Sequence, residues 1–432
     1  MKVALEDWRT IILVGDGMGD YPLEELRGKT PLEAAHTPTM DGLAARGLMG
    51  LARTIPASME PGSDIANMSL LGYDPLRYHT GRAPLEAASM GIRLGPDEVA
   101  FRCNLVNLEE APSGMRMGDY SAGHISTPEA RELIRALQEE AVLGPLRLYP
   151  GVSYRHLLVW AGGNPDLRTT PPHDIPGEPV GPYGEVYRRE PVLDSFIQRA
   201  AQVLANHPVN QRRQEAGKRT ANGVWLWGQG KAPSMPTLRE KFGIVGTMIS
   251  AVDLLKGLGV YAGLDPVPVP GATGYLDTNY RGKVQAALEA MEAGHLVYVH
   301  IEAPDEAGHE GSVAKKIQAI EDFDEKVVGP VVRGMEKFPR VRLLVVTDHL
   351  TPVHKRTHVS DPVPFLLVSH LNDGKESTGP PATFCEKSAA RTGIKVASGE
   401  ELFGLLMQPT SSAPPEQAKN RRGFFPPGKP AP

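Results

Sequence analysis

Short apolar runs alternate with longer segments of helical periodicity along much of this chain. Residues 341–346 are mostly Val and Leu, which predicts a strand buried on both faces, as in a parallel sheet. Residues 10–14 and 296–302 have the same character, and residues 313–337 carry apolar positions at a helical period. Because connections between parallel strands are right-handed, this succession predicts an α/β fold whose strands end at one common edge.

The pattern changes near residue 97 and returns to regular α/β alternation with a buried-type strand at residues 223–228. The elements predicted in between are a strand at 99–106, an amphipathic helix at 127–142, two short strands within 146–160, a Pro- and Gly-rich loop at 163–183 and a helix at about 190–206. We therefore expect a smaller α+β domain at residues 97–220. It is inserted between the two parts of the main domain, residues 1–96 and 221–408, and a flexible Pro-rich tail follows at residues 409–432.

Acidic side chains and histidines follow the predicted strands of the main domain. Asp16 lies in the turn GDGMGD after the first strand, and Asp348 and His349 follow the strand at residues 341–346. Ligands bind at the carboxyl edge of open α/β sheets, so these side chains are candidates for a site. The alternative is that they belong to ordinary tight turns, and the glycine-rich turn lacks the spacing of known phosphate-binding loops.

A third acidic segment strengthens the site interpretation. Asp305 and His309 are four residues apart, so both can face a common centre from one helical turn. The candidate ligands after the strands are then Asp16, Asp305, His309, Asp348, His349 and His358. Three carboxylates and three imidazoles form a ligand set for two divalent cations, which can activate a nucleophile and clamp a phosphoryl group.

Ser63 is the candidate nucleophile of the chain. It follows Pro61-Gly62 and precedes a helical run that Gly72 ends, so it occupies the position of a helix N-cap. Capping alone would explain a serine there. A hydroxyl at the positive end of a helix dipole is also well placed to attack or hold a phosphate, so both interpretations remain open.

Composition limits the possible partners. The formal net charge is -5, with 22% charged and 41% hydrophobic residues, which gives no general attraction to nucleic acid or to anionic membranes. No apolar run is long enough for a membrane span, and the N-terminal residues do not resemble a signal peptide. The two cysteines, Cys103 and Cys385, form neither a disulfide framework nor a zinc pattern, so we expect a cytoplasmic protein.

The chain also resembles a known family over about residues 9–406. The motifs that carry the resemblance are GDGMGD, PGSDIANMSLLGYDP, TGRAPLEA, AFRCNLV, DYSAGHIS, EAPDEAGHEG, and TDH followed by THVSDPVP. They resemble the archaeal-type cofactor-independent (2,3-bisphosphoglycerate-independent) phosphoglycerate mutases of the alkaline phosphatase superfamily. The resemblance implies an alkaline-phosphatase-like, mostly parallel sheet flanked by helices, with a smaller inserted α+β domain.

The resemblance also implies roles for the candidate residues. Ser63 would be the nucleophile that becomes phosphoserine. One metal would be held by Asp16, Ser63, Asp348 and His349, and the other by Asp305, His309 and His358. The two divalent cations are expected to be Mn²⁺, although Mg²⁺, Co²⁺ or Zn²⁺ would also suit these ligands. His354 matches no role and is interpreted as a loop histidine.

The substrate implied by the resemblance is a small phosphorylated compound, 3-phosphoglycerate or 2-phosphoglycerate, which the enzyme interconverts. His124, in DYSAGHIS, resembles a substrate-pocket histidine of the family. Trp227 stands where such mutases are expected to have an arginine. Arg155, Arg212 and Arg219 are candidates for the replacement cation, and Arg155 is the one we assign to the substrate. A homoserine kinase-like phosphotransferase and a metal-dependent phosphomonoesterase or phosphodiesterase are the alternative functions.

Overall fold

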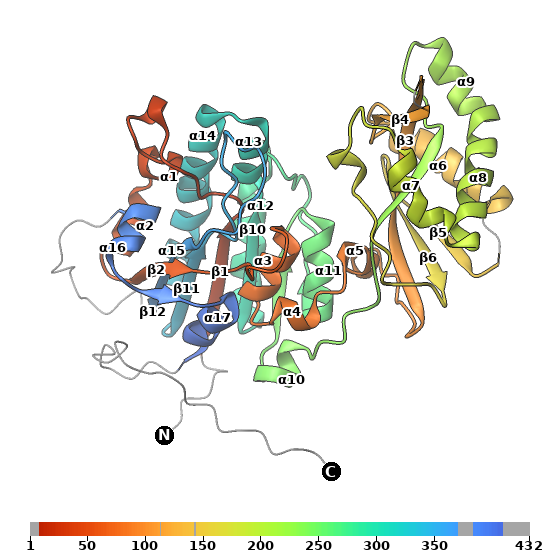
Figure 1. The fold of residues 1–432 in the computed structure, drawn as a ribbon. Coiled ribbons are helices and arrows are strands. Elements are labelled where there is room, and N and C mark those ends of the chain that lie inside the picture. The colour runs from red at the N-terminus through yellow and green to blue at the C-terminus, as the bar shows by residue number, and fades with distance from the viewer. Residues whose placement is uncertain (1–7, 113, 142–143, 370–382, 409–432) are drawn as a thin grey trace.

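The computed structural model describes residues 8–112, 114–141, 144–369 and 383–408, and these residues form two sheets with helices packed on them (Figure 1). The larger sheet has the strand order β13-β2-β12-β11-β1-β10-β8-β9. Its strands are β1 (Arg9–Gly15), β2 (Leu48–Ala52), β8 (Gly246–Ile249), β9 (Leu264–Pro266), β10 (Leu296–Ile301), β11 (Val341–Val346), β12 (Val363–Ser369) and β13 (Lys395–Val396). The predicted tail at residues 409–432 lies outside the described residues.

The larger sheet is mostly parallel, as predicted. Only β12 runs antiparallel to both of its neighbours, β11 and β2, among the described strands. The central strands β10, β1 and β11 are parallel and in register, with Val14 opposite both His300 and Val346. Their carboxyl ends therefore lie side by side, and the segments that follow them meet at one edge of the sheet.

Helices cover both faces of this sheet because the side chains of its strands alternate between two apolar clusters. In β1, Ile11 and Leu13 belong to one cluster, and Ile12 and Val14 belong to the other. The helices of the first cluster are α1 (Pro31–Ala34), α2 (Pro38–Ala44), α12 (Tyr280–Ala293), α14 (Val313–Phe323), α15 (Gly329–Met335) and α16 (Glu386–Arg391). Those of the second are α3 (Ser63–Leu70), α4 (Pro75–Tyr78), α5 (Arg82–Ser89), α10 (Leu238–Phe242), α11 (Asp253–Ala262) and α17 (Gly399–Met407). Among the described residues, no helix has the length and apolar character needed to cross a bilayer.

The smaller sheet is antiparallel and has its own apolar cluster. Its strands are β3 (Glu98–Ala111), β4 (Gly114–Asp119), β5 (Leu146–Val152), β6 (Arg155–Ala161) and β7 (Gly223–Gly230). The helices α6 (Thr127–Glu140), α7 (Gly181–Arg188), α8 (Pro191–Asn206) and α9 (Pro208–Glu215) accompany it. Figure 1 shows this sheet and its helices as a lobe beside the larger sheet.

The strand β7 belongs to the smaller sheet, whereas the predicted domain boundary at residue 220 placed it in the main domain. It pairs with β3, and Gly230 at its end lies opposite Ala100 near the start of β3. An apolar run indicates burial but does not say which sheet the strand joins, so sequence alone could not place it. The chain leaves the larger sheet and returns to it at one crossing, where a side chain on Gly230 would meet the carbonyl of Thr80 at 2.1 Å.

Candidate metal centre

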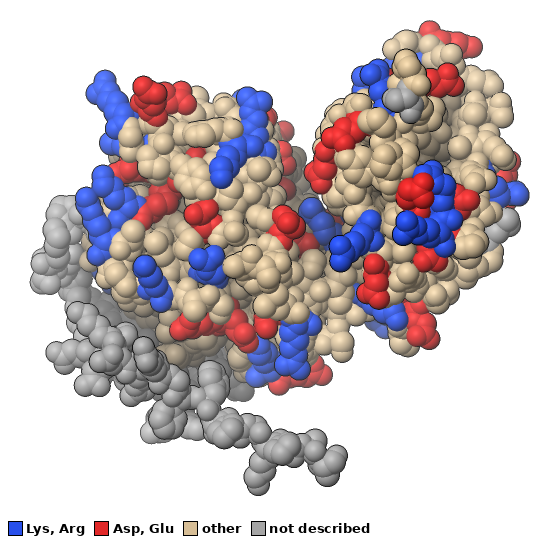
Figure 2. All heavy atoms as spheres, in the orientation of Figure 1, with Lys and Arg blue, Asp and Glu red and all other residues tan. Residues whose placement is uncertain are grey.

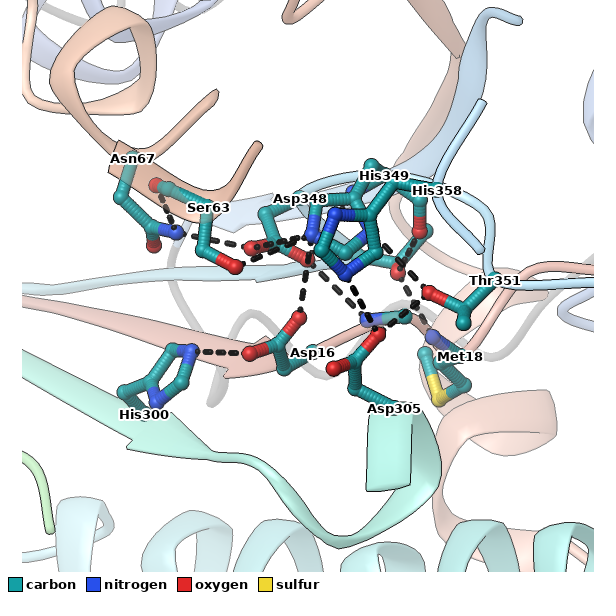
Figure 3. Close-up of polar contacts among 12 residues, drawn as sticks. Asp16, Met18, Ser63, Asn67, His300, Asp305, Asp348, His349, Thr351 and His358 are labelled. Atoms are coloured by element: carbon teal, nitrogen blue, oxygen red, sulfur yellow. Dashed lines mark hydrogen bonds and ion pairs between the residues drawn. The ribbon is translucent and has the colours of Figure 1, made fainter. Parts of the chain in front are cut away.

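Asp16 and Asp348 approach each other at the ends of the neighbouring strands β1 and β11 (Figure 3). Gly17, with a φ of 57°, turns the chain so that its N–H donates to Asp348 Oδ1 at 3.1 Å. The N–H of His349 donates to the same oxygen at 2.9 Å. A side chain on Gly17 would lie 2.5 Å from Asp305 Oδ1, so the turn needs glycine to bring these carboxylates together.

Ser63 is the first residue of α3, and Gly62 is the N-cap, which corrects the capping interpretation by one position. The N–H of Ala66 donates to the carbonyl of Gly62. The Ser63 hydroxyl faces the site, with its Oγ 3.1 Å from His349 Nε2. Capping therefore does not explain the serine, and its role as a nucleophile stays a prediction.

Asn67 ties the serine to the carboxylates, and the sequence analysis gave it no role. Its Nδ2 donates to the carbonyl of Ser63 and to Asp348 Oδ2, both at 2.7 Å. The Tyr298 hydroxyl donates to Asn67 Oδ1 at 2.6 Å, which fixes the orientation of the amide. The start of α3 is therefore held at a set distance from the end of β11.

The second group of ligands comes from α13 (Ala303–Glu310) and the loop after β11. Asp305 lies 3.2 Å from His309 Nε2 through Oδ2 and 3.3 Å from His358 Nε2 through Oδ1. His309 Nδ1 lies 3.0 Å from the carbonyl of Arg356, so Nδ1 carries a proton and Nε2 is the nitrogen that faces Asp305. Thr351 joins the two groups, because its hydroxyl donates to Asp305 and lies 3.2 Å from His349 Nδ1.

These side chains fit divalent cations. Ligand atoms of Asp305, His309 and His358 lie within 4.8 Å of one another, as do those of Asp16, Asp305 and His349. Burial and the neighbouring Asp348 and Asp305 carboxylates raise the pKa of Asp16 well above its usual value. Within the described residues, the buried Oδ1 of Asp16 accepts no hydrogen bond. Closely packed carboxylates with an unused acceptor, together with imidazole nitrogens that face them, are a donor set that divalent cations complete.

The imidazoles of the site differ in protonation. Burial would lower the pKa of His309, but the hydrogen bond to Asp305 raises it to about 9, so a cation that binds there displaces a proton. Burial lowers the pKa of His349 to about 4, so the ring is neutral at physiological pH. Burial alone would raise the pKa of Asp305, but hydrogen bonds from His309 and His358 hold it well below its usual value. The structure thus brings all seven predicted metal-site residues together, while their binding of metal stays a prediction. His354 is exposed in the loop, as expected for a residue without a role.

His300 is a further candidate that sequence reasoning missed. It lies in β10, and its Nε2 is 2.9 Å from Asp16 Oδ2. Ligand atoms of Asp16, His300 and Asp348 also lie within 4.8 Å of one another. The available signal was a single histidine in the otherwise apolar run LVYVHI.

A cavity of about 650 Å³ extends from this centre to the smaller sheet. Figure 2 shows that the molecule is hollowed between the two lobes. Three arginines line the cavity, namely Arg82 at the start of α5, Arg102 in β3 and Arg155 in β6. The sequence prediction assigns only Arg155 to the substrate, although Arg82 and Arg102 lie in the motifs TGRAPLEA and AFRCNLV.

The other residues predicted to contact the substrate lie outside the cavity lining. Arg212 pairs with Glu132, and Arg219 pairs with Asp119. His124 is exposed, and its ring lies 6.2 Å from the ring of Tyr154, which does line the cavity. A role for His124 remains a prediction.

Trp227 supports one of the cavity arginines. Its indole is buried, and the guanidinium of Arg102 lies over it at 4.1 Å from the ring centroid. Trp227 Nε1 donates to Asn104 Oδ1 at 3.1 Å, and the ring of His173 packs edge-on at 5.1 Å. Arg102 Nε lies 3.1 Å from Glu86 Oε2. Trp227, which stands where an arginine is expected, therefore packs against the guanidinium of Arg102 from the neighbouring strand β3.

Comparisons with known proteins show the family to which this fold and sequence belong. The sequence model of the 2,3-bisphosphoglycerate-independent phosphoglycerate mutases matches residues 44–210. The probable mutase of that name from Geobacter sulfurreducens is 53% identical over 400 residues, which cover 92% of this chain and 99% of the relative. The chain belongs to this family. The Methanosarcina mazei member is 51% identical, with coverage of 92% of this chain and 99% of its own.

A solved structure of the family has the same fold. The cofactor-independent phosphoglycerate mutase from Thermoplasma acidophilum is similar to this chain at a TM-score of 0.60 and 28% identity. The match covers 92% of this chain and 98% of the Thermoplasma chain. These relatives do not favour the homoserine kinase-like or phosphatase alternatives.

Proposed function

We propose that this enzyme interconverts 3-phosphoglycerate and 2-phosphoglycerate through a phosphoserine at Ser63. The observation that carries the proposal is the position of the Ser63 hydroxyl, 3.1 Å from His349 Nε2 and beside Asp16 in the cavity. The substrate follows from the family, whose curated members are named as phosphoglycerate mutases. The ligands for the two cations are Asp16, Ser63, Asp305, His309, Asp348, His349 and His358, and Mn²⁺ is the ion we propose.

The reaction consists of two transfers that reverse each other. When bound, the two cations lower the pKa of the serine hydroxyl and offset the charge of the phosphoryl oxygens. In the first transfer, a bond forms between Ser63 Oγ and phosphorus as the bond to the C3 oxygen breaks, and the serine proton ends on that oxygen. In the second, the C2 hydroxyl attacks phosphoserine, gives its proton to Ser63 Oγ and forms the isomer. No cosubstrate is needed, because the phosphoryl group returns to the same glycerate.

The protein's own groups position these steps. Asn67 binds both the Ser63 carbonyl and Asp348, so the backbone that carries the nucleophile is held beside this carboxylate. Ser63 is the first residue of α3, so a phosphoryl group on its Oγ lies near the N-terminus of the helix, where the helix dipole favours negative charge. Tight positioning of this kind is the main catalytic contribution in phosphoryl transfer.

The arginines of the opposite wall bind the carboxylate of the substrate in this proposal. Burial lowers the pKa of Arg102 to about 10, so its guanidinium stays charged at neutral pH. Arg82 and Arg155 line the same cavity and complete an anion-binding wall. The cation expected on β7 is supplied from β3, with Trp227 beneath it. The inserted domain of the prediction is extended here to about residue 230, because β7 pairs with β3.

A coupled assay tests this function directly. Purified protein with Mn²⁺ and 3-phosphoglycerate is assayed with enolase, which consumes only 2-phosphoglycerate. Product formation that is lost in Ser63→Ala supports the proposal. Phosphate release without isomerised product, or equal rates in the variant, would overturn it.

A further inference from the structure

Lys316 is a fully buried lysine beside the metal centre that has no part in the reaction described above. It lies in α14, and its side chain has no exposed surface. Its ammonium donates to the carbonyl of Gly19 at 2.9 Å, to Asp20 Oδ2 at 2.8 Å and to the carbonyl of Thr351 at 2.7 Å. All three ammonium protons therefore have partners in the protein.

The three acceptors come from the two loops that carry metal ligands. Gly19 and Asp20 belong to the turn after β1, which begins with Asp16. Thr351 belongs to the loop after β11, which begins with Thr347 and contains Asp348. The lysine itself lies on α14, the helix that follows α13 and its ligand Asp305. One ammonium thus links the two ligand loops to α14, the helix that directly follows the segment of Asp305 and His309.

Thr351 connects Lys316 to proposed ligands of both metal ions. Its carbonyl accepts from Lys316, while its hydroxyl donates to Asp305 and lies 3.2 Å from His349 Nδ1. Asp20 is fixed in a similar way, because Oδ2 also accepts from the N–H of Val353 at 3.1 Å. A displacement of either loop would break contacts on the other.

A buried ammonium is a suitable device here for an electrostatic reason. The loops place several carboxylates close together, and their repulsion opposes the folded arrangement before any cation binds. Lysine is costly to bury, and the cost is offset only by good geometry and a complete set of hydrogen bonds. Lys316 has this complete set of hydrogen bonds, and it is not among the residues that line the cavity.

We propose that Lys316 is a positioning residue that holds the two ligand loops and Asp305 at the spacing required for two divalent cations. It does not touch substrate. The inference rests on the proposed function only in that the site binds divalent cations. Its test is therefore Mn²⁺ binding without substrate, which stays informative whether or not the enzyme isomerises phosphoglycerate.

The test compares Mn²⁺ affinity by titration calorimetry in metal-stripped wild type, Lys316→Met and the double variant Lys316→Met/Asp20→Asn. Methionine keeps the length of the stem, and the double variant avoids an uncompensated buried carboxylate if the single variant fails to fold. We expect the affinity to fall about 10- to 100-fold, as for other residues that orient metal ligands. Lys316→Arg is expected to recover less than wild-type affinity, because a planar guanidinium cannot reproduce the three contacts.

Arg342→Met is the matched control. Arg342 is a buried cation near the opposite end of β11, where it stacks on Trp8 at 4.1 Å and donates to the carbonyl of Gln408 at 2.8 Å. Its loss should lower the unfolding temperature while leaving Mn²⁺ affinity unchanged. Wild-type affinity in the folded double variant, or an equal loss of affinity in Arg342→Met, would overturn the proposal.

Discussion

The cavity lies between a wall made from the ends of parallel strands and a wall made from an antiparallel sheet. On the first wall, Asp16, Asp348 and Asp305 are buried, and the last two accept hydrogen bonds from neighbouring loops. On the second, Arg102 rests on an aromatic ring, and Arg155 is exposed to solvent. The first wall holds the reacting groups at fixed distances from one another. The second wall presents positive charge to a substrate that has to enter the cavity and reorient there.

This contrast indicates a division of labour. A metal centre fails if one ligand moves by a fraction of an ångström, so its support is redundant and buried. An anion-binding wall tolerates small shifts, because charge attraction falls off gradually with distance. Substitutions on the first wall should therefore abolish activity, and those on the second wall should lower it only in part.

The largest effect is expected for Ser63→Ala, which removes the nucleophile. Activity in the enolase-coupled assay should fall by on the order of 10⁶-fold, as when other catalytic serines are deleted. The exposed Ser58 is the control position, and Ser58→Ala should match wild type. Mass spectrometry of protein quenched with substrate should show a phosphate on Ser63 in the wild type. Phosphorylation elsewhere would contradict the assignment.

Removal of metal tests the first wall as a whole. Chelation should abolish isomerisation and lower the free energy of unfolding, because ions that bind only the folded state stabilise it by about 2.7 kcal/mol at 100 times the dissociation constant. Addition of Mn²⁺ should restore both properties. Thermal unfolding with and without chelator measures the second. An unchanged unfolding temperature would argue against a site built from these buried carboxylates.

An intermediate effect is expected for Arg102→Met on the second wall. Loss of one charge-assisted hydrogen bond to the carboxylate costs about 1.5–3 kcal/mol, or roughly 10- to 150-fold in kcat/KM. Most of the change should appear in KM, because the arginine binds a part of the substrate that does not react. Arg212→Met, which removes an exposed cation paired with Glu132, should leave both constants unchanged. If Arg102→Met lowered kcat and left KM unchanged, Arg102 would act on the reaction itself and not on substrate binding.

The smallest effect is expected for Trp227→Phe, which leaves a smaller aromatic ring under the guanidinium of Arg102. A desolvated cation–π contact is worth about 2 kcal/mol with tryptophan and less with phenylalanine, so a decrease of a few-fold in kcat/KM is expected. Trp227→Ala should approach the effect of Arg102→Met, because the guanidinium would lose its support. Equal kinetics in Trp227→Ala and wild type would show that Arg102 does not depend on the ring.

The first wall could be predicted from sequence because its residues follow a simple rule. Asp16, Asp348 and His349 come directly after apolar strands, and parallel strands end at one edge. Asp305 and His309 lie four apart on one helix, α13, as their spacing required. His300 could not be recognised because it lies near the end of the apolar strand β10, where a histidine is usually a core residue.

The second wall could not be predicted in the same way. Arg102 lies within the apolar strand β3, and the face on which it emerges depends on how β3 pairs with β6 and β7. Arg212 and Arg219 were conspicuous as a basic cluster, but local acidic partners neutralise them. Charge in a sequence shows that cations are present, whereas their availability to a ligand depends on tertiary pairing.

The crossing at which the chain leaves and rejoins the larger sheet bears on how specificity can change. Because Ala100 and Gly230 are paired, the whole segment between them begins and ends at nearly one point. Such a segment can be exchanged between relatives as a cassette, carrying Arg102, Arg155 and Trp227 together and leaving the ends of β1, β10 and β11 untouched. Substitutions of the cavity-facing residues within this segment therefore leave the backbone of the metal-ligand loops in place.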